Sequence, residues 1–392
     1  MMKICVLLEA DIYHLRGEFM AIHNRMKYLV KEPDLDVVIY NIQRYYDNFT
    51  NWIRGNKQIE LKNDFYLDGI HYHCLYYKRS YLDYFMRSVS KYQTTIEANR
   101  VKRYKKLFAD YDLIFSHSLL TGLLALELKQ KSGIPFVMMW HGSSIHTLPF
   151  ENKTIFSLTK RVLLNSNHNF FVSKELHKIA NTIIGTDCVG SVSPNGVDTS
   201  VFFKYSIEKK KEVARQLQVN TDNVNIAFVG NHLPIKNVQF LPKLFLSIHK
   251  EYPEAVFHII GSGEFKNDYK EVPFTIRYWE NQLPDRMPDL YNCMDLIVMP
   301  SIKEGLPMTC LESTACGTAF VGSRVGAIAD VVGKDNTVPF SPTFETDFAH
   351  LCKEKLTNNN NSIHLPKQYC VEHVVATEKE MFIKVISGTA DC

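Results

Sequence analysis

The sequence lacks several features that define other classes of protein. Its nine cysteines are odd in number and form no C-x-x-C pair, so they indicate reduced thiols rather than a disulfide framework or a zinc site. No apolar run approaches the length of about 18 residues that a transmembrane helix needs, and the short first run ends at Glu9, which suits a strand better than a signal peptide. A net charge of +3 is too small to indicate a nucleic-acid partner. These absences favour a cytoplasmic globular protein that binds no nucleic acid.

The sequence does contain apolar strands that alternate with helices, the pattern of parallel sheets covered on both faces. At 392 residues the chain is longer than one core usually supports, so we expect two α/β domains. The expected strands cover residues 3–8, 37–40, 113–116, 136–140 and 169–172 in the first half, and 225–229, 255–260, 274–278, 296–299 and 319–321 in the second. Turn residues at Pro194-Asn195-Gly196 predict the hinge. The predicted domains are 1–195 and 196–367, followed by a helix in 368–392.

Two glutamates lie eight positions apart around a predicted helix start. Glu304 follows an apolar strand and lies in a loop, whereas Glu312 lies in the second turn of a helix expected to begin at Pro307. A rise of about 1.5 Å per residue separates the two carboxylates by roughly 10 Å, with unpaired helix amides between them. This frame suits a nucleotide sugar, with Glu304 at the sugar, Glu312 at the ribose and the helix start at the diphosphate. A capped helix with two surface acids is the alternative interpretation.

The arrangement resembles the E-x7-E motif of retaining GT-B glycosyltransferases of family 4 (group 1). Other segments share the resemblance, in the family's order: Asn195-Gly196-Val197-Asp198 with Phe202, Phe228-Val229-Gly230 with Lys236-Asn237, Ile259 to Gly263, and Asp295 to Ser301. Together these segments extend over about half the chain. The resemblance implies the GT-B fold, two Rossmann-like domains with a cleft between them. It also implies an acceptor domain at the N-terminus, a donor domain at the C-terminus, and a final helix that crosses back to the first domain.

The activity implied by this resemblance is retaining, metal-independent hexosyl transfer. The donor would be a UDP- or GDP-linked sugar, which is a co-substrate, so no cofactor is expected. The acceptor would be a carbohydrate or a lipid-linked glycan of bacterial cell-surface polysaccharide or glycolipid synthesis. Two alternatives stay open, a GT-B-like sugar-nucleotide epimerase and a catalytically silent sugar-nucleotide-binding subunit. The second is motivated by Asn231, which stands where the family usually has an arginine; Arg324 or His232 could take the arginine's place.

The resemblance also assigns roles to single residues. Lys236 matches the lysine that neutralises the leaving diphosphate, and His141 matches a first-domain histidine that faces the donor sugar; with Glu304 they form the expected catalytic set. The alternatives without a catalytic role are that Lys236 is an ordinary solvated lysine and that His141 is a buried histidine. The residues expected to bind the nucleotide sugar are Glu312, Gly17, Gly230, Asn231, Gly261, Gly305, Leu306, Pro307 and Met308. Gly17 could equally be a simple helix start.

No pattern of metal ligands lies near these residues. No D-x-D lies where a metal-dependent GT-A enzyme would need it, and Asp34-Leu35-Asp36 directly precedes a strand of the first domain. His71-Tyr72-His73 is better interpreted as one face of an exposed strand than as metal ligands. We therefore expect that helix amides and Lys236 replace a metal ion at the diphosphate.

A basic, tyrosine-rich stretch extends from His71 to Leu107, with nine basic and two acidic residues. Such a stretch in the acceptor domain could contact an anionic membrane that carries a lipid-linked acceptor, which would place the protein at the inner face of the membrane. A solvated helix face is the alternative. The sequence names neither the donor base and sugar, nor the acceptor and linkage, nor the oligomeric state.

Overall fold

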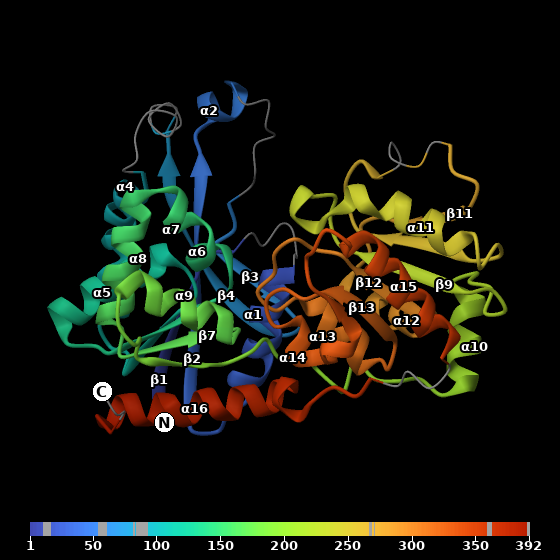
Figure 1. Ribbon diagram of the computed structural model, residues 1–392. Coiled ribbons are helices and arrows are strands. Elements are labelled where there is room, and N and C mark those ends of the chain that lie inside the picture. Colours follow the sequence, from blue (N-terminus) through green and yellow to red (C-terminus); the bar gives the residue numbers. More distant parts are fainter. Residues whose placement is uncertain are drawn as a thin grey trace. The chain divides into compact units, whose positions relative to one another are not determined.

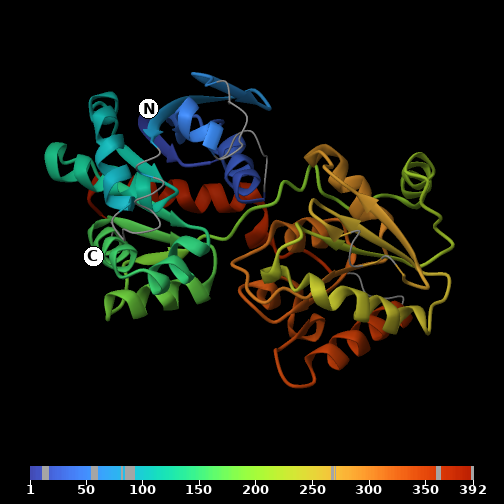
Figure 2. The same cartoon turned by 90° about the horizontal axis from the view of Figure 1, so that it is seen from above.

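The computed structural model describes residues 1–10, 17–53, 61–80, 83, 93–265, 269, 271–358 and 363–389. Contacts divide the chain into two compact units, the first formed by Met1–Pro194 with Val374–Cys392 and the second by Asn195–His373 (Figure 1). The first strand and the last helix therefore belong to the same unit, as Figure 2 also shows.

The first unit is an eight-stranded sheet with the order β3-β4-β2-β1-β5-β6-β7-β8. All neighbouring strands are parallel except β3 and β4. The strands are β1 (Met2–Leu8), β2 (Leu35–Tyr46), β3 (Asp64–Leu67), β4 (Ile70–Arg79), β5 (Leu113–Ser116), β6 (Phe136–Trp140), β7 (His168–Phe171) and β8 (Gly190–Val192). The helices are α1 (Gly17–Leu29), α2 (Asn48–Ile53), α4 (Gln93–Val101), η1 (Lys102–Phe108), α5 (Leu119–Ser132), α6 (Ser143–His146), α7 (Leu148–Glu151), α8 (Lys153–Asn165), α9 (Lys174–Ile184) and α16 (Val371–Ser387).

The second unit is a six-stranded, wholly parallel sheet with the order β11-β10-β9-β12-β13-β14. The strands are β9 (Asn225–Val229), β10 (Val256–Ile260), β11 (Thr275–Trp279), β12 (Leu296–Met299), β13 (Ala319–Ser323) and β14 (Thr337–Val338). The helices are α10 (Ile207–Gln216), η2 (Pro234–Lys236), η3 (Val238–Phe240), α11 (Leu241–His249), η5 (Pro284–Arg286), α12 (Met287–Cys293), α13 (Met308–Ala315), α14 (Ile328–Val332), η6 (Lys334–Asn336), α15 (Phe344–Thr357) and η7 (Lys367–Tyr369).

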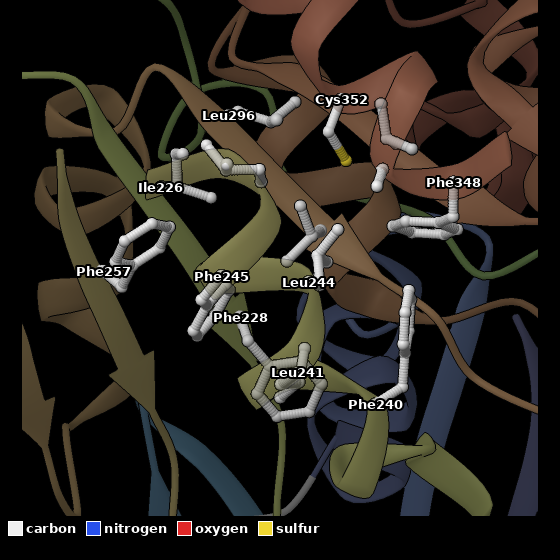
Figure 3. Close-up of a cluster of buried hydrophobic side chains, with 14 of the residues drawn as sticks. Ile226, Phe228, Phe240, Leu241, Leu244, Phe245, Phe257, Leu296, Phe348 and Cys352 are labelled. Carbon is white, nitrogen blue, oxygen red and sulfur yellow. The ribbon is translucent and has the colours of Figure 1, made fainter. Parts of the chain in front are cut away.

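Helices cover both faces of the second sheet. On one face, α11 and α15 contribute Phe245 and Phe348 to a buried cluster with Phe228 of β9 and Phe257 of β10 (Figure 3). On β12, Leu296 and Val298 belong to the same cluster, whereas Ile297 between them is equally buried but lies outside it. Strands buried on both faces explain why the sequence shows continuous apolar runs here rather than an alternating pattern.

Each sheet has a point at which the strand order reverses. In the second unit it lies between β9 and β12, and in the first between β1 and β5. The loops that follow two such strands leave the sheet in opposite directions, so a crevice opens beyond the carboxyl ends, where open α/β sheets bind ligands. A ligand site is therefore expected among the residues that follow β9 and β12 or those that follow β1 and β5.

The predicted fold class, two α/β domains with parallel sheets, is confirmed. The structure also has four strands that were not predicted as such from apolar runs, β3, β4, β8 and β14. Two of them, β8 and β14, are very short. The β4 strand alternates buried and half-buried residues, and only its His71 to His73 segment was expected to be extended. The antiparallel β3–β4 hairpin is the departure from a wholly parallel first sheet.

The last helix, α16, is attached to the first unit by a buried ion pair. Arg25 of α1 donates from Nε to Glu378 of α16 at 2.9 Å, and neither side chain is exposed. Ser193 donates a further hydrogen bond to the same carboxylate. Among the described residues, no helix combines the length and the apolar character needed to cross a membrane. The described cysteines are free thiols, and all are buried except the half-buried Cys370.

Candidate functional site

The loop after β12 leads into α13 at the point where the second sheet reverses its strand order. The helix begins at Met308, so the prediction that Pro307 is its first residue was wrong. Pro307 is the residue before the helix, with an extended ψ of 134°, and it contributes no side-chain cap. The first amides of a helix have no partners in a preceding turn, and of those in α13 that of Cys310 donates to the carbonyl of Pro307 at 3.1 Å. Their partial positive charge lies at the carboxyl end of the sheet, where an anion would be stabilised.

The loop in front of α13 is held in one conformation by backbone contacts. Asn195 is buried, and its side-chain amide donates to the carbonyl of Leu306 at 2.8 Å. The amide of Ala327 donates to the carbonyl of Gly305 at 2.9 Å. Gly326 has a φ of 56°, and a Cβ there would lie 2.3 Å from the carbonyl oxygen of Gly305. The loop is thus preorganised, and Asn195, predicted as a turn residue and as part of the family's segment Asn195 to Asp198, is one of its supports.

Glu312 extends from the second turn of α13 into a largely buried position. Tyr291 of α12 is fully buried, and its hydroxyl donates to Oε2 of Glu312 at 2.9 Å. Burial raises the pKa of Glu312 to about 7, while the hydrogen bond from Tyr291 acts in the opposite direction. The carboxylate can therefore lose its charge near neutral pH. Tyr291 was missed from the sequence because one aromatic residue in an apolar segment carries no signal of its own.

Lys236 and Glu304, which the sequence assigned to different parts of a donor, form an ion pair. The distance from Lys236 Nζ to Glu304 Oε1 is 2.6 Å, with 22% and 11% of the side chains exposed. The amide of Ile302 donates to the carbonyl of Ile235 at 2.8 Å, which joins the loops that follow β9 and β12. Asn237 has a left-handed φ of 54° and ends η2 directly after Lys236. The switch point therefore brings both charged groups to one place beside the start of α13.

Gly230 and Gly261 approach each other closely after β9 and β10. A Cβ on Gly261 would lie 2.0 Å from the carbonyl oxygen of Gly230, so a larger residue would require the turns to separate. The side chain of Asn231 accepts a hydrogen bond from the hydroxyl of Ser262 at 2.8 Å. These contacts give the two glycines a packing role in addition to any contact with a nucleotide.

The two residues considered as substitutes for the family arginine have other contacts. Arg324 donates from Nε to Thr337 at 3.1 Å, and from its guanidinium to backbone carbonyls of Lys334 and Thr337. His232 packs edge-on against Phe265 with ring centroids 4.7 Å apart. In this conformation the guanidinium of Arg324 therefore supports the segment before β14.

In the first unit, the predicted His141 follows β6 and pairs with another histidine. His117 follows β5, and its Nδ1 lies 3.0 Å from Nε2 of His141, with the rings stacked at 5.3 Å. Burial, His141 and Arg25 hold the pKa of His117 well below its usual range, so His117 is uncharged near neutral pH. His117 was missed, although its place directly after a predicted strand is the signal that identified His141.

Gly17, the remaining predicted residue of the first unit, is the first residue of α1. The preceding residues 11–16 lie outside the described part of the chain. His141 and Gly17 belong to the first unit, and the other predicted site residues to the second.

Comparison with known protein families gives two matches, which together extend over more than half of the chain. The model described as "Glycosyltransferase Family 4" matches residues 67–201, and the model described as "Glycosyl transferases group 1" matches residues 223–358. The chain is 28% identical over 233 residues to a Bacillus subtilis glycosyltransferase named for teichuronic acid biosynthesis, TuaC, covering 59% of this chain and 58% of the relative. It is 25% identical over 241 residues to the Escherichia coli UDP-Gal:alpha-D-GlcNAc-diphosphoundecaprenol alpha-1,3-galactosyltransferase, covering 55% and 58%. The chain thus spans somewhat more than half the length of these relatives.

Solved structures with the same fold cover the whole chain. Sucrose-phosphate synthase from Thermosynechococcus elongatus aligns with a TM-score of 0.74 at 13% identity, over 99% of this chain and 100% of that one. HepE of Anabaena, solved in complex with UDP-glucose, aligns with a TM-score of 0.69 at 14% identity, over 99% and 100%. At these identities the likeness shows a shared two-domain GT-B fold.

Proposed function

The chain belongs to the glycosyltransferases of group 1 and family 4, and from that premise we propose that it moves a sugar from a nucleotide-sugar donor to an acceptor. The acceptor class that we propose is a growing glycan of bacterial cell-surface polysaccharide or glycolipid synthesis. Relatives named for teichuronic acid synthesis and for a diphosphoundecaprenol-linked acceptor support this choice.

One observation carries the proposal, the ion pair of Lys236 with Glu304 in the loop that leads into α13, the helix that carries Glu312. The three side chains come from two loops and a helix that meet where the second sheet reverses its order. A cation, a row of helix amides and two carboxylates match the groups of a sugar nucleotide, namely the diphosphate and the hydroxyls on either side of it.

We propose that transfer proceeds with retention of configuration on one face of the sugar. The bond between the anomeric carbon and the diphosphate oxygen breaks, and a bond to the acceptor oxygen forms on the same face. The proton of the acceptor hydroxyl passes to the departing phosphate oxygen, so no nucleophile from the protein is needed. His141 and Glu304 would orient the sugar, and Glu312 would hold the ribose.

Lys236 and the first-turn amides of α13 would stabilise the charge that grows on the diphosphate, so the proposed reaction requires no metal ion and no cofactor besides the UDP- or GDP-linked donor. Lys236 forms an ion pair with Glu304 in the structure. When a donor binds, the ammonium group of Lys236 must therefore interact with the phosphates as well as, or instead of, the carboxylate of Glu304. Glu304 would then be released to accept hydrogen bonds from the sugar.

A panel of nucleotide sugars tests the proposal. A donor at 100 times its Kd stabilises the fold by about 2.7 kcal/mol, which a thermal shift detects. The donor that binds is then incubated with lipid-linked and soluble acceptors, and the anomeric configuration of the product is determined by NMR. Turnover of the donor without any acceptor would indicate an epimerase. Binding with neither transfer nor hydrolysis would indicate a silent subunit, and an inverted product would contradict retention.

A further inference from the structure

The hairpin formed by β3 and β4 of the first unit brings together three side chains with metal-binding atoms, none of which belongs to the predicted sugar-nucleotide site. Asp64 lies on β3, and His71 and His73 lie on β4. Their ligand atoms, one from each residue, all lie within 4.8 Å of one another. We propose that Asp64, His71 and His73 bind a late first-row divalent metal ion, with zinc as the expected one.

The strand register produces this cluster. His71 and His73 are two positions apart on β4 and so project from the same face of the sheet. Asp64 pairs directly with His73 across the hairpin. The turn that fixes this register is Asp68-Gly69, whose φ values of 48° and 76° are both positive, as a two-residue hairpin turn requires. The sequence His71-Tyr72-His73 alone did not indicate a metal site because the third ligand comes from the neighbouring strand.

The distances fit a tetrahedral ion after a small movement. Zinc binds imidazole nitrogen and carboxylate oxygen at about 2.0–2.2 Å, which places two ligand atoms of a tetrahedron about 3.4 Å apart. His73 Nδ1 lies 3.4 Å from Asp64 Oδ1. His71 Nε2 lies 2.6 Å from the same oxygen, as in a hydrogen bond, and these two atoms would separate as the ion replaces the shared proton.

Neighbouring aromatic rings hold the two imidazoles in position. The ring of Tyr66 stacks on His71 at 4.5 Å with an interplanar angle of 4°, and Tyr40 stacks on His73 at 5.2 Å. The three ligand side chains are between 34% and 50% exposed, so an ion can reach them from solvent. Two imidazoles with one carboxylate favour zinc, copper or nickel over magnesium or calcium, and one coordination position stays open for water.

A bound ion would join the edge strand β3 to β4 independently of sugar transfer. Zinc is titrated calorimetrically into the full chain after removal of any histidine tag and treatment with EDTA. Cobalt serves as a spectroscopic probe of ligand type and geometry. We expect one zinc ion per chain, a nitrogen and oxygen ligand spectrum without sulfur-to-cobalt charge transfer, and a zinc-dependent rise in the unfolding temperature.

Substitutions distinguish a metal site from a hydrogen-bonded cluster. His71→Ala and His73→Ala should each weaken zinc binding by about 10-fold or more, since even outer-shell partners of a metal contribute that much. Asp64→Asn keeps a hydrogen-bond acceptor for His71 but loses the charge, so it should weaken zinc binding while the unfolding temperature of the metal-free protein stays near that of the wild type. His350→Ala, an exposed histidine of α15, is the matched control and should leave zinc binding unchanged. Equal zinc affinity in all four variants, thiolate bands with cobalt, or no zinc binding by the wild type would each overturn the proposal.

Discussion

At the residue scale, Glu312 is the residue with the most specific proposed role. If its carboxylate holds the ribose, Glu312→Ala should weaken binding of the donor and of the free nucleoside diphosphate together. A hydrogen bond to a charged acceptor contributes about 1.5–3 kcal/mol, and calorimetry at pH 8 measures this loss. Glu345→Ala, an exposed glutamate of α15, is the control. Unchanged affinity of Glu312→Ala for both ligands would remove Glu312 from the site.

The pKa of Glu312, which burial raises, predicts a pH dependence of donor binding. The pKa of Glu312 is raised to about 7, so the carboxyl is protonated below this pH and charged above it. Since the charged form accepts hydrogen bonds from the ribose, donor affinity should rise as the pH increases through about 7. The intact donor is the correct ligand because its esterified diphosphate does not titrate near neutral pH.

Tyr291→Phe tests whether this tyrosine positions and tunes the carboxylate. Because the hydrogen bond lowers the pKa of Glu312, its loss should move the midpoint of the binding curve to higher pH. A tyrosine that merely fills space would lower stability without moving that midpoint. Affinity curves for the wild type and the variant, measured over about two pH units on either side of the Glu312 pKa of about 7, decide between the two roles.

Single residues also show what the sequence could and could not predict about the site. The spacing of Glu304 and Glu312 around a helix start is a local property, so it was visible from the sequence. The ion pair of Glu304 with Lys236 was not visible from the sequence, because it depends on two loops that the strand order brings together. Tyr291, His117 and Asn195 each form a hydrogen bond with a residue distant in sequence, and a single sequence does not give such pairings, although the place of His117 directly after a strand marks it as a candidate.

At the scale of elements, the attachment of α16 to the first unit depends on the pair Arg25 and Glu378. Both side chains are fully buried, so removing one partner leaves an uncompensated charge. Arg25→Met or Glu378→Gln should therefore destabilise the fold by about 3–5 kcal/mol. Urea unfolding and loss of hydrogen-exchange protection in α16 measure the effect.

The double variant and a neighbouring ion pair provide the controls for this prediction. Arg25→Met combined with Glu378→Gln removes the charges together and should recover a large part of the lost stability. Lys379 on the same helix pairs with Glu32 and Asp34 near the surface, so Lys379→Met should cost at most about 1 kcal/mol. A double variant as unstable as the sum of the single ones would show that shape, rather than charge, determines the effect.

Elements differed in how well the sequence predicted them. Central strands such as β5, β6, β9 and β12 were predicted with their observed bounds, because burial on both faces gives a continuous apolar run. The β3–β4 hairpin was not predicted, because its strands carry polar and aromatic residues on a half-exposed surface. For the same reason, the sequence pointed only to His71 and His73 of the proposed metal site and not to Asp64.

At the scale of the whole molecule, the proposed chemistry makes transfer independent of metal ions. The chain should keep most of its transferase activity in excess EDTA, and added magnesium or manganese should not increase it, because in the proposed mechanism Lys236 and helix amides would balance the charge of the diphosphate. A product assay with and without EDTA gives the result. Activity that disappears and returns with added metal would mean that an ion bridges the diphosphate, and would refute this mechanism.

The second property of the whole molecule is its predicted contact with an anionic membrane. Parts of the basic stretch, residues 81–82 and 84–92, lie outside the described chain. Of the rest, Lys102 pairs with Glu127 at 2.6 Å, and Arg103 donates to Tyr76 and Tyr104. Lys106 is exposed next to Leu107, and Lys105 lies close to Lys131. Lys105 and Lys106 are thus the better positions at which to test lipid contact.

If this surface contacts lipid, the chain should bind vesicles that contain anionic lipid, and binding should weaken with salt because the Debye length is only about 8 Å at physiological ionic strength. Each lysine near an anionic surface contributes about 1 kcal/mol, so changing Lys105 and Lys106 to Ser should weaken vesicle binding by about 2 kcal/mol. The same change at Lys209 and Lys211, exposed on α10 in the second unit, removes equal charge and should have little effect. Co-sedimentation at low and at physiological salt measures all three proteins. Equal losses in both variants would show that net charge alone attracts the protein to lipid, and no binding by the wild type at low salt would argue for an acceptor outside the membrane.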